Sequence, residues 1–273
     1  MRDRVDREKE RNTMSFPNVI WGNEGEQFNT YAAEVGNDGI PRSRWPAGTK
    51  MILQDGREFR FGQAGGSTLG VGKLDVAPAV GANFDNLVIP AAVAAGSTDV
   101  TITNGATTIA AGDFADGYLN IEDDTGEGYL YKIKSHTVEA AGSAAVTVTL
   151  ANNSGLQVAL TTSSTVGLMP NHYRNLIVHP SPNVSVPVGV DMAVLTTLRW
   201  GWFQTRGVAS VLADGTPTIG LSVMPSDAVD GAVESWKLTE ATPNTEITPI
   251  VGVTIETAVD TEYGLTMLNI LGA

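Results

Sequence analysis

Alternation of apolar and polar positions, with no helical period, runs through most of this chain. Arg57–Phe61 (REFRF), Asp99–Thr103 (DVTIT) and Ala145–Leu150 (AVTVTL) carry apolar residues at every second position, as half-buried strands do. Turn dipeptides typical of β-hairpins lie between such segments, among them Asp55-Gly56 and Asp214-Gly215. Short strands spaced by about 8–12 residues, with turn residues between them, are typical of sandwiches and barrels. The sequence therefore predicts an all-β protein.

The strand pattern also predicts how the chain is divided. Residues 87–169 hold six short strand signals and are expected to form a β-barrel-like module. Residues 32–86 and 170–273 flank this module and are expected to contribute two segments of a second β-sandwich or barrel domain. Residues 1–31 are expected to be an extended N-terminal arm. No internal repeat recurs at a fixed period, which weighs against a solenoid or propeller.

The N-terminal segment differs from the rest in composition. Residues 1–13 alternate charges of opposite sign and hold one apolar residue, Val5, so a helix here would have no face to pack on a core. They are a docking arm, a frayed tail, or residues read from an upstream start codon before a true start at Met14. Residues 16–31 follow with no strand or helix period. Their aromatics lie either on the chain's own core or on a neighbour, and we predict partner binding by all four: Phe16, Trp21, Phe28 and Tyr31.

Composition narrows the classes of function. The net charge of −13 and the absence of a basic stripe argue against nucleic-acid binding, which depends on Lys and Arg contacts to phosphates. No run approaches the roughly 18 apolar residues of a membrane span, and residues 1–13 are too charged for a signal peptide. The chain has no cysteine, which excludes disulfides and thiolate zinc sites. We expect a protein made in a cytoplasm.

Acidic residues are numerous but scattered. The densest cluster, Glu122–Glu127, lacks the Asp-x-Asp-x-Asp-Gly spacing of a calcium loop and is better explained as a hairpin tip. A glycosidase needs two carboxylates across a cleft, and the sequence cannot pair any of the candidates in this way. Those candidates are Glu122, Glu127, Asp214 and Glu234.

Other catalytic patterns are weak. His136, His172 and His179 have no Gly-x-Ser-x-Gly elbow and no metal-helix spacing to accompany them. The glycine-rich stretch 65–70 lacks the lysine of a phosphate-binding loop. We therefore expect a protein that is not an enzyme, with no catalytic residue, no metal site and no cofactor.

One aromatic concentration, Trp200–Phe203, stands out. Strand alternation places Trp200 and Trp202 on the same face, where two large residues usually form a core layer. The alternative is an exposed platform for a carbohydrate or a partner.

Two stretches resemble a known class of proteins. Residues 201–215 (GWFQTRGVASVLADG) are followed by Thr218–Leu221, Gly231–Val233 and Pro249–Val253, and residues 117–135 precede them. This order of strands and turns resembles the small β-domains of tailed-bacteriophage head decoration (cement) proteins and related virion structural proteins. The chain is longer than one-domain members of that class.

The resemblance implies a function and partners. It implies a decoration protein on the capsid exterior of a virion that bridges major capsid subunits, as a homotrimer over local three-fold axes and through an N-terminal arm. The alternative is a head-fibre or tail-associated protein that binds a host glycan through Trp200–Phe203 and the loops near Gly142 and Asn152. A polysaccharide hydrolase and a non-viral surface protein are the remaining alternatives.

Overall fold

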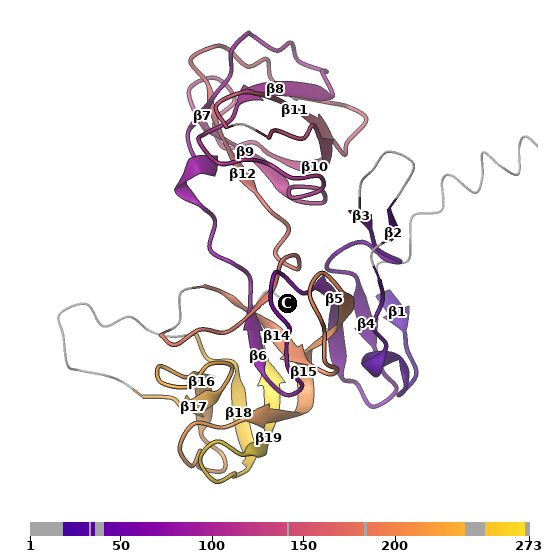
Figure 1. Cartoon of the computed structure of the whole chain (residues 1–273), viewed down its shortest axis with the longest axis vertical. Coiled ribbons are helices and arrows are strands. Elements are labelled where there is room, and N and C mark those ends of the chain that lie inside the picture. Colours follow the sequence, from indigo (N-terminus) through magenta and orange to yellow (C-terminus); the bar gives the residue numbers. More distant parts are fainter. Residues whose placement is uncertain are drawn as a thin grey trace, which may run out of the picture.

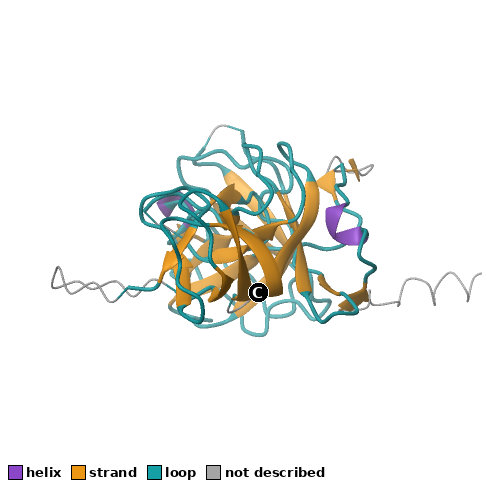
Figure 2. Ribbon diagram, turned by 90° about the horizontal axis from the view of Figure 1, so that it is seen from below, coloured by secondary structure: helices purple, strands orange, loops and turns teal. Residues whose placement is uncertain are grey.

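The computed structural model describes residues 19–32, 34–35, 41–140, 142–182, 185–237 and 249–270. The predicted all-β class is confirmed, because these residues form nineteen strands and two one-turn 3-10 helices, η1 (Glu26–Phe28) and η2 (Ala82–Phe84). Figure 2 shows both short helices at the periphery of the strands. Among the described residues, no helix is long and apolar enough to cross a membrane.

Six strands form a closed barrel, which is the upper lobe in Figure 1. Around the barrel they follow the order β10, β11, β8, β7, β12, β9. Alternation explains the core: Val100 and Ile102 of one strand pair with Val148 and Val146 of the next, and all four are fully buried. The strands are β7 (Leu87–Val88), β8 (Asp99–Thr103), β9 (Tyr118–Asp123), β10 (Leu130–His136), β11 (Ala145–Leu150) and β12 (Thr165–Met169).

An eleven-stranded sheet forms the lower lobe. Its main path runs β1 (Val19–Trp21), β4 (Lys50–Ile52), β5 (Glu58–Gln63), β15 (Trp200–Leu212), β19 (Tyr263–Asn269), β18 (Gly252–Glu256), β16 (Ser222–Pro225) and β17 (Val233–Ser235). Strands β6 (Leu74–Val76), β13 (Ile177–Val178) and β14 (Pro187–Asp191) branch from β15. The short strands β2 (Glu34–Val35) and β3 (Pro41–Arg42) pair only with each other.

Strand β15 is the centre of this sheet. The sequence predicts two strands here, 200–204 and 208–212, but the structure has one strand of 13 residues. A register shift between Gln204 and Arg206, followed by Gly207 with φ of 91°, lets the strand continue where the alternation is interrupted. Its first half pairs with β5 and its second half with β19.

The aromatic residues of β15 lie in the core. Trp200 and Trp202 are buried on one face, where Phe61 stacks on Trp200 at 5.4 Å between ring centroids. Phe203 is buried on the other face against Leu176 and its neighbours. The predicted core layer is confirmed, and the alternative of an exposed platform at 200–203 is wrong.

Along the sequence, the barrel is inserted between β6 and β13, two strands that pair with each other in the sheet. The chain leaves the sheet after β6 and returns at β13, where Val76 pairs with Ile177. The returning segment also holds the lobes together: the Asn171 side-chain amide donates to the Asp116 carbonyl at 2.9 Å, and the Arg174 guanidinium donates to the Ala115 carbonyl at 3.2 Å. We call this narrow region between the lobes the waist (Figure 1).

The predicted N-terminal arm divides at residue 19. Residues 1–18, including Phe16, lie outside the described residues. Val19–Trp21 forms β1, which pairs in parallel with Lys50–Ile52. The backbone of Tyr31 exchanges two hydrogen bonds with Trp200, of 2.8 and 2.9 Å. Residues 19–31 are therefore part of the sheet lobe, in contrast to the predicted arm boundary at residue 31.

Candidate docking surface

One face of the large sheet is exposed or partly exposed to solvent along a row that crosses five strands. The register aligns Trp21 with Ile52, Ile52 with Glu58, Glu58 with Arg206, and Arg206 with Asn269. Residues opposite one another in neighbouring strands project from the same side. Trp21 therefore lies on the same side of the sheet as the exposed residues of β15 and β19, and we call this side the outer face.

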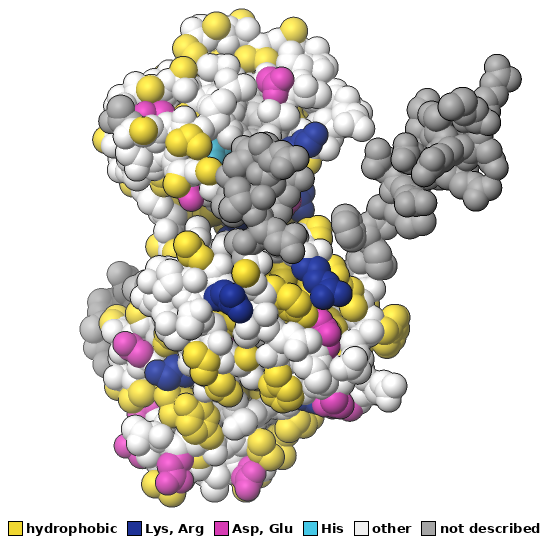
Figure 3. Space-filling view, turned by 45° about the vertical axis from the view of Figure 1, so that its right-hand side comes forward, with side chains coloured by type: hydrophobic (Ala, Val, Ile, Leu, Met, Phe, Trp, Pro, Cys, Tyr) yellow, Lys and Arg dark blue, Asp and Glu magenta, His cyan; other side chains and the backbone are white. Residues whose placement is uncertain are grey.

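A groove of about 920 Å³ is hollowed into the outer face. Val208, Met267 and Val253 line it as one cross-strand row over β15, β19 and β18, and each is exposed by about two fifths. The β4–β5 hairpin tip, Asp55–Arg57, and the loop residue Ile250 also line it. Figure 3 shows hydrophobic side chains exposed over the sheet lobe. The apolar row is surface that a partner can remove from water, at about 25 cal/mol per Å².

Glycines allow the strands to come close beneath this groove. A Cβ on Gly252 would lie 2.4 Å from the Met267 carbonyl oxygen, so no other residue fits without a backbone shift. Gly207 has a φ of 91° and adjoins the side chain of Arg57, where a Cβ would lie 2.8 Å from its Cγ. The shape of the groove floor therefore depends on these two positions.

Arg57 fastens the segment that follows β1 to the hairpin beside the groove. Its guanidinium donates to Asp55 at 2.5 Å, to Glu24 at 2.6 Å and to the Gln27 side-chain oxygen at 2.8 Å. Burial lowers the pKa of Arg57, but the hydrogen bonds and charges of Asp55 and Glu24 together raise it above its usual value. The contacts hold residues 24–27 against the edge of the groove.

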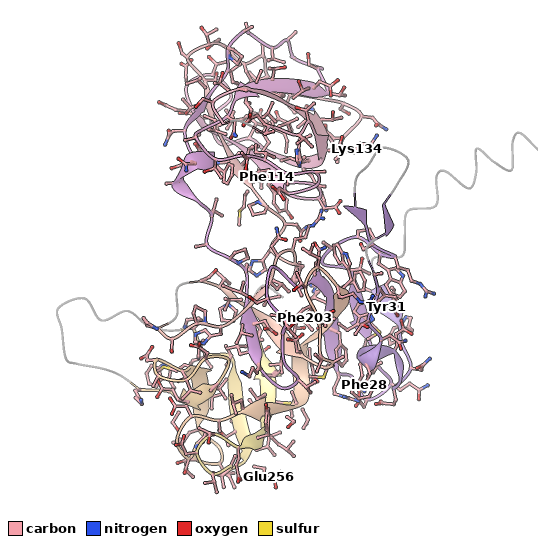
Figure 4. The ribbon with its side chains drawn as sticks, viewed as in Figure 1. Phe28, Tyr31, Phe114, Lys134, Phe203 and Glu256 are labelled. Carbon is pink, nitrogen blue, oxygen red and sulfur yellow. The ribbon has the colours of Figure 1, made fainter. Side chains whose placement is uncertain are left out.

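The four aromatics predicted from the sequence to bind a partner have different positions. Trp21 is 77 % exposed and Phe28 is 58 % exposed. Tyr31 instead packs edge-on against Trp45 at 5.3 Å between ring centroids. Figure 4 shows Phe28 and Tyr31 at one edge of the sheet lobe. Phe16 lies outside the described residues. Trp21 and Phe28 are thus the two described members that a partner can reach.

The Tyr31 hydroxyl is hydrogen-bonded to another residue of the chain. It donates a hydrogen bond to the Glu26 carboxylate. Burial first, and then the hydrogen bond and charge of Glu26, raise the pKa of Tyr31 to about 12. Tyr31 therefore remains a neutral phenol that fixes η1 to the core.

The groove residues were not predicted from the sequence. Alternation in β19 assigns Gly264, Thr266 and Leu268 to the buried face, and their neighbours Leu265 and Met267 to the outer face. Apolar residues on both sides of a strand are the available signal, but alternation alone cannot tell whether the second side meets another layer or water.

The acidic candidates do not meet at one site: Glu127 and Asp214 lie in turns or bends, whereas Glu122 lies in β9 and Glu234 in β17. Glu122–Glu127 spans the β9–β10 hairpin, where Asp124 and Gly126 have positive φ, as its interpretation as a hairpin tip requires. Asp214 accepts a hydrogen bond from the Ser226 hydroxyl, and Glu234 forms an ion pair with Lys237. Among the described residues, no group of three or more His, Asp or Glu side chains is placed to hold a metal.

The three histidines lie apart. His136 Nε2 accepts a hydrogen bond from the Phe114 backbone at 3.1 Å, inside the barrel lobe. His179 is buried after β13, and His172 lies at the waist beside Tyr173. Burial lowers the pKa of His172 and of His179, so both are neutral at pH 7. The glycine-rich stretch 65–70 joins the sheet lobe through Leu69, which bridges to Leu195.

The comparisons with known proteins add no relative: no protein-family model, no curated protein and no solved structure matches this chain.

Proposed function

We propose that this chain is a bacteriophage capsid decoration (cement) protein, which binds the outer surface of the capsid and stabilises the shell by bridging major capsid subunits. The outer face carries the proposal. Its cross-strand row of Val208, Met267 and Val253, exposed in a groove with a polar rim, has the composition of a protein-binding surface.

The occupant we propose for the groove is a loop of a major capsid subunit with apolar side chains at its centre and a carboxylate at its edge. Charge favours this choice. The Arg206 side chain is 65 % exposed at the rim, and its nearest acidic partner, Glu58, is 3.7 Å away and already pairs with Lys50 at 2.7 Å. A carboxylate from the capsid would give Arg206 the bidentate partner it lacks.

Bridging requires a second contact on a neighbouring subunit. Trp21 and Phe28 supply one, because both are exposed near β1, which is the last strand at this edge of the sheet within the described residues. An aromatic anchor beside an open strand edge suits a partner that adds a strand there. We further propose a homotrimer, in which three copies multiply modest contacts into stable binding.

Binding to shells tests the proposal. Capsid shells of the same virus, assembled without this chain, are mixed with it and sedimented. We expect wild type to co-sediment, and Met267→Glu to lose binding because it places a charge in the apolar row. Val259→Glu is the matched control, since Val259 is 65 % exposed and does not line the groove. Equal binding by Met267→Glu and wild type, with folding retained, would refute the proposed surface.

The copy number in virions gives an independent test. A decoration protein is present in hundreds of copies, so we expect quantitative mass spectrometry to find a ratio to the major capsid protein close to that of a shell component. A handful of copies per virion would point to a tail or fibre location. The alternative of a glycan-binding fibre lacks its expected aromatic platform, because Trp200, Trp202 and Phe203 are buried.

A further inference from the structure

A second cavity, unrelated to the docking surface, lies at the waist. It has a volume of about 300 Å³. Three parts of the chain contribute to it: the sheet lobe, the barrel strands β9 and β10, and the segment that returns from the barrel. Clefts between domains are frequent sites of small-ligand binding. The lining residues are Ala47, Gly48, Arg60, Tyr118, Lys132, Asn171, His172 and Tyr173.

The charge of this cleft is opposite to that of the chain. The whole sequence has 30 acidic and 17 basic residues, yet no Asp or Glu is among the described residues that line the cleft. Arg60 from the sheet and Lys132 from the barrel bring two permanent positive charges to it. Figure 3 shows Lys and Arg side chains on both sides of the waist. A concave site lined by one sign of charge concentrates ions of the other sign.

Arg60 is held in place by one side-chain hydrogen bond, and within the described part of the chain its other guanidinium donors are unused. One guanidinium nitrogen, Nη1, donates to the Gly48 carbonyl at 3.0 Å, and the group lies 5.9 Å from the centroid of the Tyr173 ring. A guanidinium has five N–H donors, so one such bond orients it and leaves a fork for a ligand. Gly48 keeps the site open, since its φ is 82° and a Cβ there would lie 2.8 Å from the Tyr173 ring.

Lys132 lies on barrel strand β10 and faces the sheet lobe, which contains Arg60. It alternates with the buried residues Tyr131 and Ile133, so its side chain points outward. It forms no ion pair with any residue in the described ranges. Its cross-strand partner is Tyr118, which also lines the cleft. Lys132 and Tyr118 therefore form the barrel side of the cleft.

The remaining polar lining residues shape the cleft. The Asn171 side chain is already used, because it donates to Asp116 and accepts from the Tyr173 backbone at 2.9 Å. His172 packs its ring edge-on against Tyr173 at 5.3 Å between ring centroids. The binding chemistry thus comes from Arg60, Lys132 and Tyr118.

We propose that the waist cleft binds a phosphate-class oxyanion between Arg60 and Lys132, linking the two lobes. A phosphate group matches a guanidinium fork on one side and an ammonium on the other. The anion would offset the repulsion between two like charges that the fold brings to one cavity. The group is either free phosphate or a phosphate ester on a sugar or glycerol, since a cavity of this size admits both.

Calorimetric titration of the full chain at pH 7 and low salt tests this site. The two probes are inorganic phosphate and glycerol 3-phosphate. We expect saturable binding of at least one, with one anion per chain. Binding of inorganic phosphate assigns the free ion, and binding of the ester alone assigns an esterified group. If neither probe gives saturable heat, the proposal is wrong.

Substitutions distinguish binding in the cleft from nonspecific attraction of the anion to positively charged side chains. Lys132→Gln removes one of the two cations and is expected to weaken binding by about tenfold. Lys134→Gln is the matched control, because Lys134 lies on the same strand and side but does not line the cleft (Figure 4). Arg60→Lys keeps the charge and removes the fork, so a loss there shows bidentate recognition. Equal losses from Lys132→Gln and Lys134→Gln would overturn the site, provided circular dichroism shows both variants folded.

Discussion

Asp75 and Asp191 place two carboxyl groups side by side in the interior of the sheet lobe. Asp75 lies on β6 and Asp191 on the neighbouring strand β14, and both side chains are fully buried. No donor in the described ranges meets hydrogen-bond geometry with their four oxygens. Burial first, and then the charge of Asp191, raise the pKa of Asp75 well above its usual range. Burial raises the pKa of Asp191 to about 8. The pair therefore retains at least one proton at neutral pH, where an ordinary carboxyl group is ionised.

Stability should fall as the pH rises through the range set by this pair. Both folded-state pKa values lie above the unfolded value of 3.8, so the folded chain binds more protons between pH 4 and pH 8. The contribution is complete below about pH 4 and is lost as the pH approaches 8. Lys73 and His179 lie nearby, and the charge of Lys73 works against the shift of Asp75. Urea unfolding at pH 5 and pH 8 measures the slope.

Asp191→Asn provides the matched variant. An amide can donate to the Asp75 carboxylate without taking up a proton, so we expect a smaller loss of unfolding free energy between pH 5 and pH 8 than in wild type. Asp230→Asn, at an exposed loop, is the control and should keep the wild-type slope in this range, since its pKa is lowered by hydrogen bonds from Ser181. An unchanged slope in Asp191→Asn would show that the pair does not hold the proton.

Substitution of two tryptophans by alanine should change the free energy of unfolding by very different amounts. Trp202 is buried among the rings of Phe61 and Trp45, so Trp202→Ala should cost about 3–5 kcal/mol of unfolding free energy. Trp21 projects from the outer face, and Trp21→Ala should change stability by about 0.5 kcal/mol or less. Chemical denaturation gives both values. A large loss in Trp21→Ala would mean that this side chain is covered by the protein itself.

Glycine substitutions test the close packing under the groove. Gly252→Ala would push its Cβ against the Met267 carbonyl oxygen, and we expect a loss of about 1–3 kcal/mol. Gly66→Ala is the control, because nothing lies within 4 Å of the added atom and the change should be within about 0.5 kcal/mol. Melting temperatures of the two variants rank the effects, and equal values would contradict the packing described for β18 and β19.

Arg57→Ala should release the segment around η1. The buried Gln27 side-chain oxygen loses its donor, and Glu24 loses its ion pair, which together should cost about 1–2 kcal/mol. Cleavage by a glutamate-specific protease after Glu24 or Glu26 should become faster. Arg206→Ala removes a more exposed guanidinium 3.7 Å from Glu58 and should leave the cleavage rate unchanged.

Local pattern was enough to predict most of the barrel strands but not their partners, and it gave no sign of β1, which forms in a segment without a strand period. Alternation around Val100 and Val148 identified two barrel strands, because one face of each meets a core. The pattern at 200–212 predicted two strands, since Gly207 and Thr205 interrupt the alternation, and only pairing with β5 and β19 carries the strand through. The length of β15 is therefore set by its pairing with neighbouring strands and not by its local sequence pattern.

The positions of the site residues depend even more on pairing between strands that are far apart in the sequence. The sequence shows Trp21 only as an aromatic residue in an irregular segment, and its place on the outer face follows from pairing of β1 with β4. Asp75 and Asp191 are ordinary acidic residues in the sequence, and their meeting follows from the register of β6 and β14. The waist cleft requires Arg60 and Lys132 from different lobes. No spacing rule relates residues that come together only through the fold.

The hydrogen-bonded neighbours Val76 and Ile177 have a consequence for engineering and for evolution. Because the chain departs from and rejoins the sheet at adjacent positions, everything between them is topologically a very long hairpin loop. Loop-closure entropy grows slowly with length, so a tight turn could substitute for the whole barrel at little entropic cost. The same junction could accept an unrelated domain whose termini lie close together. The pairing of β6 with β13 thus predicts that the barrel can be exchanged for another domain while the strand order of the sheet lobe is kept.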